Sequence, residues 1–168
     1  MLTKWLERRL QSWLEGVRTG NPAQAKLAFD WATPARTQRV LHVGCGQAQQ
    51  LDMPGEFAQT TWQEIRLDGD AAAQPHIVAS MSDMSVVPDG AVDAVYSSHG
   101  IEHLYWHEVP LAFAEFHRVI ADDGFLVVTC PDLQAAAQMI AEDKLFEPAY
   151  ESPAGTITPF DIVFSYRP

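Results

Sequence analysis

The sequence has few cysteines, no long hydrophobic run and no internal repeat. Two of its 168 residues are cysteine, Cys45 and Cys130, and both fall at the ends of expected strands in an apolar region. We therefore expect reduced thiols and a cytoplasmic location, because disulfides belong to oxidising compartments. No apolar run is long enough for a membrane span. The amphipathic N-terminus carries an acidic residue, unlike a secretory signal.

Basic residues are also scarce. Eleven Lys and Arg stand against 22 Asp and Glu, for a net charge of −11. Residues 1–39 carry seven bases and three acids, a net +4, so the remainder carries −15. This acidic body lacks the basic footprint of non-specific nucleic-acid binding, and we expect neither a nucleic-acid nor a membrane partner. The basic N-terminal segment either contacts an anionic partner or, as we favour, forms a solvated helix face.

The remaining composition is that of a globular domain. Apolar residues make up 47% of the chain, enough for a real core in one domain of this length. Strand signals alternate with helical ones, which predicts an α/β fold: a doubly wound, Rossmann-like, mostly parallel sheet with helices on both faces. The expected strands are 40–43, 62–67, 77–79, 92–96 and 125–130, and the expected helices are 109–120 and 133–143.

The most informative run is Val-Leu-His-Val-Gly-Cys-Gly-Gln-Ala, from Val40 to Ala48. It reads as a short buried strand that breaks into a glycine-rich turn. Glycine admits positive φ angles and lets a ligand approach the backbone closely. A turn of this kind after the first strand of an α/β unit is where nucleotide-like cofactors bind.

Two later segments fit the same kind of site. Asp68 ends the second expected strand, 22 residues after Gly46, and an acid at this offset accepts ribose hydroxyls in dinucleotide folds. The alternative for Asp68 is a turn aspartate. After the third strand comes Ser-Met-Ser-Asp-Met, residues 80–84. Its methionines either hold an adenine ring beside Asp83 or belong to the core.

The glycine turn and these two segments, with four others in order, resemble the class I S-adenosylmethionine-dependent methyltransferases, and more narrowly the small-molecule type. The resemblance covers about residues 38–133. The matching segments are Val40–Gly46, Leu67–Asp68, Asp83, Pro88–Val95, Glu102–Leu104, Glu115–Phe125 and Cys130–Asp132.

The resemblance implies a role for each matching position. Gly44, Cys45 and Gly46 would wrap the methionine part of the cofactor through their backbone, and Asp68 would hold the ribose. The adenine would be bordered by Ser82, Asp83 and Met84, and the reacting methyl would be faced by Ser98 and His99. His42 stands where the family has an acid that helps to orient the cofactor's ammonium group. Ala48 replaces a common third glycine, and Asp122-Asp123-Gly124 replaces a Lys-Pro-Gly-Gly turn.

The end of the chain departs most from the family, whose sheet continues after the fifth strand with a helix and an antiparallel strand pair. Here 36 residues follow Asp132, and we expect only 161–166 to form a strand. The fifth strand would then be an exposed apolar edge, which proteins avoid. We expect the tail or a second copy to cover it, in a homodimer joined near 125–130, and we read the chain as a shortened family member.

This organisation predicts three parts: an N-terminal helical extension over 1–36, a cofactor-binding domain over 37–146 and an irregular tail over 147–168. Within the extension, apolar residues at spacings of three and four predict a helix over 2–17, and a second helix is expected over 22–31. The first helix covers the cofactor cleft, forms a dimer face or, as we favour, packs on the core.

The methyl acceptor is expected to be a small molecule, and a base is needed only if it is a hydroxyl or an acidic carbon. His99 is the best-placed candidate and His103 the second. The alternative for His103 is a structural hydrogen bond with Glu102. His99, His103 and His107 would share one face of a continuous helix, but Gly100 argues against that helix, and we expect no metal.

Two other functions stay open from the sequence. The chain could be an inactive module that binds S-adenosylmethionine or S-adenosylhomocysteine and acts as a regulatory or pairing subunit, which His42 and the altered ending favour. It could also be a nicotinamide-dependent oxidoreductase. That alternative is disfavoured because the turn lacks Gly-x-Gly-x-x-Gly and Asp83 would have no role.

Overall fold

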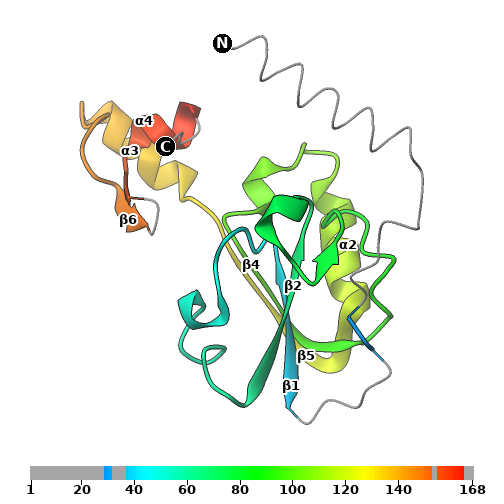
Figure 1. Cartoon of the computed structure of the whole chain (residues 1–168). Helices are drawn as coiled ribbons and strands as arrows, with labels where there is room; N and C mark the ends of the chain where they lie inside the picture. The colour runs from blue at the N-terminus through cyan, green and yellow to red at the C-terminus, as the bar shows by residue number, and fades with distance from the viewer. Residues whose placement is uncertain (1–28, 32–36, 153–154, 165–168) are drawn as a thin grey trace.

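The structure is a computed structural model that describes residues 29–31, 37–152 and 155–164 (Figure 1). The expected helix over 2–17 lies outside these residues, as does most of the one over 22–31, whose last three residues are described and are not helical. None of the described helices is long and apolar enough to cross a membrane. The three predicted parts of the chain stay a prediction.

Five parallel strands form the central sheet, in the order β3-β2-β1-β4-β5. They are β1 (Gln38–Val43), β2 (Trp62–Asp68), β3 (Ile77–Val78), β4 (Val92–Ser98) and β5 (Ile120–Thr129). The predicted α/β class with a mostly parallel sheet is confirmed. The order reverses between β1 and β4, so their carboxyl ends flank the crevice where ligands of such sheets bind.

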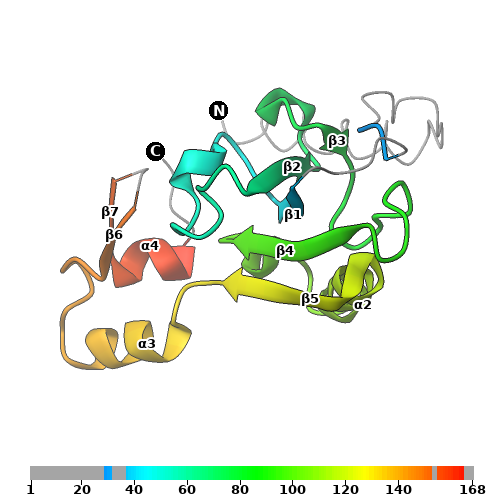
Figure 2. The same cartoon turned by 90° about the horizontal axis from the view of Figure 1, so that it is seen from below.

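Each face of the sheet carries its own apolar cluster, because alternate residues of a strand point to opposite faces. Helix α2 (Val109–Val119) packs on one face through Ala112, Phe116 and Val119 (Figure 2). On the other face, Met53 and Phe57 cluster with Val40, Ala94 and Tyr96. Between β1 and β2 the regular structure is one 3-10 turn, η2 (Gln50–Asp52); residues 44–61 otherwise cover this face with turns.

The junction of α2 and β5 is tighter than expected. In place of a separate turn at Asp122–Gly124, β5 begins at Ile120 and its register with β4 shifts between Val92 and Ala94. A Cβ on Gly124 would lie 2.5 Å from Cγ2 of Ile120 and 2.7 Å from the Asp93 carbonyl oxygen. Only glycine fits this irregularity.

The described part of the tail contains regular structure, and the strand expected over 161–166 is wrong for residues 161–164, which are helical. After α3 (Leu133–Ala141), β6 (Tyr150–Ser152) and β7 (Gly155–Ile157) form an antiparallel hairpin, and α4 (Pro159–Phe164) follows. Asp161 Oδ2 accepts hydrogen bonds from the Thr158 amide (2.9 Å) and hydroxyl (2.7 Å), and the Asp161 amide donates back to Thr158 Oγ1. This reciprocal cap, with proline at the first helical position, starts a helix and outweighs the strand propensity of the apolar residues.

The tail does not pair with β5. Helix α3, the β6–β7 hairpin and α4 lie together beyond the carboxyl end of β5 (Figures 1 and 2). Among the described residues, β5 pairs with β4 alone. Phe125 and Leu126 of β5 are 41% and 36% exposed. The described part of the tail therefore leaves the outer edge of β5 open.

Candidate cofactor site

The glycine turn follows β1 directly and has the expected backbone. Gly44 and Gly46 have φ angles of +69° and +50°, a region that favours glycine. Gly44 faces other residues: a Cβ there would make ordinary contacts, 3.4 Å from Met81 Cε and 3.7 Å from the Gly100 Cα. Gly46, in contrast, has open space where a side chain would be. The turn thus joins the ends of β1 and β4 and exposes backbone to a ligand at Gly46.

Asp68 at the end of β2 lies against this turn. Its Oδ2 accepts a 2.8 Å hydrogen bond from the Gly46 amide, and its Oδ1 accepts one of 2.8 Å from the Asp70 amide. The residue is half-buried. Each carboxylate oxygen has further lone-pair capacity. Asp68 is therefore held next to the glycine turn and can still accept two hydroxyl hydrogen bonds.

Arg66 of β2 stabilises the glycine turn through a hydrogen bond to its backbone, a role that the sequence pattern did not reveal. Its guanidinium is buried and donates to the carbonyl oxygens of Gly46 (2.7 Å), Ala73 (3.2 Å) and Gln74 (3.3 Å). A cation between two apolar residues, Ile65 and Leu67, was the available signal. Three carbonyl acceptors fix the peptide of Gly46 in place.

Cys45 contributes its backbone to the turn and not a reactive thiol. The side chain is buried and free. Burial raises the pKa of the Cys45 thiol to about 11, against the opposing effect of the Arg66 guanidinium. The thiol is therefore protonated at neutral pH and is not a nucleophile.

His42, two residues before the turn, forms a buried pair with Glu64 of β2. The distance between His42 Nδ1 and Glu64 Oε1 is 2.7 Å, and the two side chains are 4% and 8% exposed. The His42 ring also lies 5.1 Å from the ring of Tyr96. A glutamate of the neighbouring strand thus partners the histidine on β1.

The loop after β3 has Asp83 on the surface and Met84 in the core. Asp83 is exposed, its Oδ1 accepts from the Ser85 amide, and Ser82 Oγ lies 2.8 Å from Ser80 Oγ. Met84, in contrast, is fully buried in the core beneath α2. The Met84 side chain thus follows the alternative in which the methionine belongs to the core.

At the end of β4, the structure brings together residues from three segments. Ser98 Oγ accepts from the Thr129 hydroxyl at 2.8 Å, and the His99 amide donates to the Thr129 carbonyl oxygen at 3.0 Å. His99 Nδ1 lies 3.3 Å from Glu102 Oε1. The His99 ring stacks on that of Tyr150 of β6, with centroids 5.8 Å apart. Tyr150, far along the chain, was not identified from the sequence.

His103 does not join this cluster. Its side chain is exposed, and Glu102 pairs with His99, which does not fit the alternative of a structural hydrogen bond between Glu102 and His103. The turn η4 (Ile101–His103) ends before His107, so the three histidines do not share a helix face. The described residues hold no group of three or more His, Cys, Asp or Glu side chains that could bind a metal ion.

The Glu-x-x-Arg motif of α2 is structural. Arg118 pairs with Glu115 (2.7 Å) and Asp89 (2.6 Å) and donates to the carbonyl oxygens of Met84 and Val87. The Arg118 guanidinium holds the pKa of the Glu115 carboxyl below its ordinary value, since its hydrogen bond favours the charged form. The motif ties the loop before β4 to α2.

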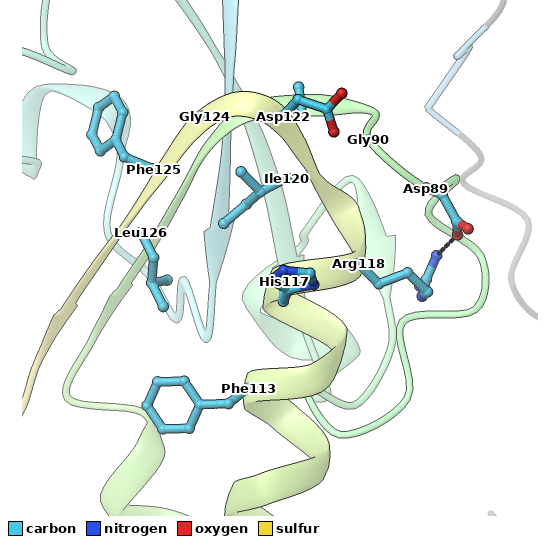
Figure 3. A pocket seen from close by; sticks show the side chains of 11 residues that line it. Asp89, Gly90, Phe113, His117, Arg118, Ile120, Asp122, Gly124, Phe125 and Leu126 are labelled. Atoms are coloured by element: carbon cyan, nitrogen blue, oxygen red, sulfur yellow. Dashed lines mark hydrogen bonds and ion pairs between the residues drawn. The ribbon is translucent and has the colours of Figure 1, made fainter.

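A large hollow of about 880 Å³ lies away from the glycine turn, at the start of β5. The side chains of Phe113, Leu126 and Phe125 lie on one side of it and the Arg118–Asp89 pair on the other (Figure 3). It opens beside the unpaired edge of β5. The candidate cofactor site lies at the strand ends and not in this hollow, whose lining includes neither the glycine turn nor Asp68.

A family model described as a methyltransferase domain matches residues 41–128. The chain belongs to this methyltransferase family. The match runs from β1 to β5 and includes the glycine turn, Asp68 and the Glu-x-x-Arg motif. The cofactor of the family is S-adenosylmethionine. A comparison with curated proteins gave no match.

Solved structures show the same fold. A SAM-dependent methyltransferase from Archaeoglobus fulgidus is 18% identical, with 77% of this chain and 58% of that chain covered and a TM-score of 0.50. A Pyrococcus horikoshii protein is 14% identical, with 92% and 72% covered and a TM-score of 0.50. The chain spans 28% to 58% of the length of four of the matched chains.

The residues present fit the family's cofactor. Backbone is exposed at Gly46, where a ligand can approach. The Asp68 carboxylate lies against the turn with acceptor capacity left for a ribose. Both lie at the crevice where the strand order reverses.

Proposed function

We propose that the chain is an S-adenosylmethionine-dependent methyltransferase that acts on a small-molecule acceptor. The observation that carries the proposal is the contact between Gly46 and Asp68 at the reversal of strand order, in a chain of the methyltransferase family. Bound S-adenosylmethionine supplies a methyl group already activated on a sulfonium. The protein then has to position the acceptor and exclude water.

The proposed roles follow the geometry. The backbone of Gly44, Cys45 and Gly46 lies along the methionine part, and Asp68 accepts the ribose hydroxyls. Exposed Asp83, with Ser82 beside it, binds the adenine amine. Ser98 and His99 face the reacting methyl from the end of β4. His42 acts from its buried position by fixing the strand end, together with Glu64.

The test is calorimetric titration with S-adenosylhomocysteine. We expect micromolar binding by the wild-type chain and a loss of about 100-fold in Asp68→Ala, the effect of hydrogen bonds to a charged acceptor worth about 3 kcal/mol. The matched control is Asp70→Asn, which alters a neighbouring carboxylate whose side chain caps η3 (Ala71–Ala73). Equal losses in both variants, or no binding by the wild type, would overturn the proposal.

We also propose that a second copy of the chain covers the open edge of β5. The support is a ten-residue strand whose outer edge is unpaired among the described residues, with exposed Phe125 and Leu126 beside the hollow. Two such edges pair antiparallel about a twofold axis, which leaves neither β5 edge open.

Sedimentation tests this dimer. We expect wild-type protein to sediment as a dimer and Leu126→Glu as a monomer, because a buried charge at the edge opposes pairing. Leu133→Glu is the matched control, since Leu133 is 67% exposed on α3, outside the edge. A wild-type monomer, or a dimer that survives Leu126→Glu, contradicts the arrangement.

The free cysteines support a proposal of cytoplasmic location. Cys130 is an exposed thiol, and exposed thiols persist in reducing compartments. Cell fractionation with an antibody to the chain would test it, and recovery in an oxidising compartment would refute it.

A further inference from the structure

Three side chains lie together at the end of the sheet where we propose that the methyl group is transferred. Two of them are close in the chain, and the third comes from a distant segment. His99 directly follows β4, Glu102 lies in η4, and Tyr150 belongs to the β6–β7 hairpin. Glu102 Oε1 is 3.3 Å from Nδ1 of His99. The Tyr150 ring stacks on the His99 ring at 5.8 Å with an interplanar angle of 26°. The tail thus contributes to the same end of the sheet as the glycine turn.

The backbone at His99 is strained in a way that points to a function. His99 has a φ of +51°, which non-glycine residues rarely adopt. The amide of His99 is held by the Thr129 carbonyl oxygen, so the conformation is supported by β5. The result is a ring that projects from the strand end and is 46% exposed.

The contact with Glu102 determines which nitrogen of the His99 ring can accept a proton. A carboxylate beside Nδ1 favours the tautomer with the proton on that atom, which leaves Nε2 as an acceptor. Tyr150 is not an alternative base. Its burial, and the nearby charge of Glu102, raise the pKa of the phenol, so it is protonated at neutral pH.

We propose that His99 is the general base for a hydroxyl acceptor, that Glu102 is its positioning residue, and that Tyr150 forms an aromatic wall of the acceptor site. The proposal rests on the proposed function. In the transfer, the acceptor oxygen forms a bond to the methyl carbon as the methyl–sulfur bond breaks. The bonding pair stays on sulfur, and the hydroxyl proton moves to Nε2 of His99.

This arrangement favours a phenol over an amine. A phenol has an ordinary pKa of about 10 and is mostly protonated at neutral pH, so its oxygen becomes strongly nucleophilic only as a base removes the proton. A neutral aromatic amine has its lone pair available without a base. The exposed part of the stacked His99 and Tyr150 rings offers a flat surface to an aromatic acceptor.

The experiment uses the full chain, radiolabelled S-adenosylmethionine and two matched sets of probes, phenols and the anilines with the same substituents. Binding of S-adenosylhomocysteine is measured on every variant. We expect label on the phenols, and a loss of 10²- to 10⁴-fold in kcat in His99→Gln, the range for general acid–base catalysis. His117→Gln, on α2, is the matched control and should leave kcat unchanged.

The other variants separate catalysis from folding. Glu102→Gln should lower kcat about 10-fold at unchanged KM, and Glu102→Asp should restore most of it. Tyr150→Phe should keep activity, because it keeps the ring, whereas Tyr150→Ala should raise KM. All should bind S-adenosylhomocysteine as the wild type does.

The outcomes test the proposed function and the role of His99 separately. If S-adenosylhomocysteine does not bind, the proposed function fails. If it binds but label appears on the anilines or on neither set, or if His99→Gln retains kcat, the role of His99 and the acceptor class are refuted while the cofactor site stands.

Discussion

His42 Nδ1 and Glu64 Oε1 lie 2.7 Å apart on adjacent parallel strands, at the point where β1 enters the glycine turn. Both side chains are buried. A buried acid without a partner would be strongly destabilising, and so would a buried cation. The histidine on β1 and the glutamate on β2 therefore have to be considered together, because each satisfies the other.

The first prediction concerns this pair. Restoring the family's acid alone, as His42→Asp, should lower the free energy of unfolding by about 3–5 kcal/mol, because it places two carboxylates together in a buried site. Adding Glu64→Gln should recover about 2 kcal/mol, since it removes the repulsion. Urea denaturation of the single and double variants measures both. Strictly additive losses would show that the two side chains do not interact.

A second prediction concerns Arg66. Arg66→Met should cost about 2–4 kcal/mol, because it leaves three carbonyl oxygens without their donor. It should also weaken binding of S-adenosylhomocysteine, since the Gly46 peptide loses its brace. Lys144→Met, which removes an exposed cation paired with Glu142, should change neither property. Thermal unfolding and calorimetry measure the two effects, and unchanged binding in Arg66→Met would count against the brace.

The two cysteines should differ in reactivity. At pH 7–8 a thiol reagent should modify exposed Cys130 quickly and leave Cys45 intact, because Cys45 is buried and its pKa is raised to about 11. Cys45 should react only after unfolding. Mass spectrometry of the labelled protein locates the modification, and Cys130→Ser should abolish the fast phase. Rapid labelling of Cys45 in the folded protein would contradict its burial.

Low pH should weaken the contacts of Glu115 that join α2 to the loop before β4. The pKa of Glu115 is lower in the folded protein than its ordinary value of 4.5. The charged carboxylate therefore contributes fully to stability above the ordinary pKa, and this contribution is lost as the pH falls through the lower pKa of the folded protein. The melting temperature of the wild type should therefore fall more steeply below about pH 5 than that of Glu115→Gln. Parallel slopes for the two proteins would show that Glu115 titrates without consequence.

Much of the fold could be predicted from local sequence. The strands from Val40, Trp62 and Val92 and the helix from Val109 begin within two residues of the expected positions. Asp132 caps α3 as expected, with its side chain accepting from the Ala135 amide. These features depend on periodicity and on turn and cap chemistry, which act over a few residues.

The predictions that were wrong or left open share one cause, because each segment allowed two structures and a residue outside the segment decided between them. Residues 161–164 are apolar enough for a strand, but a cap formed with Thr158 made them helical. Met84 is in a loop that could have been exposed, but α2 provides an apolar pocket below it. In both cases the deciding partner lies outside the segment from which the prediction was made.

The sequence by itself determined the parallel sheet, the glycine turn after β1 and the position of Asp68, since each depends on residues close together in the chain. Only the tertiary structure decided that Glu64 partners His42, that Arg66 braces Gly46 and that Tyr150 stacks on His99. Those contacts join residues 20 to 51 positions apart, and strand register and the path of the tail bring them together. Periodicity reports which face a residue occupies, but not which distant residue meets it there.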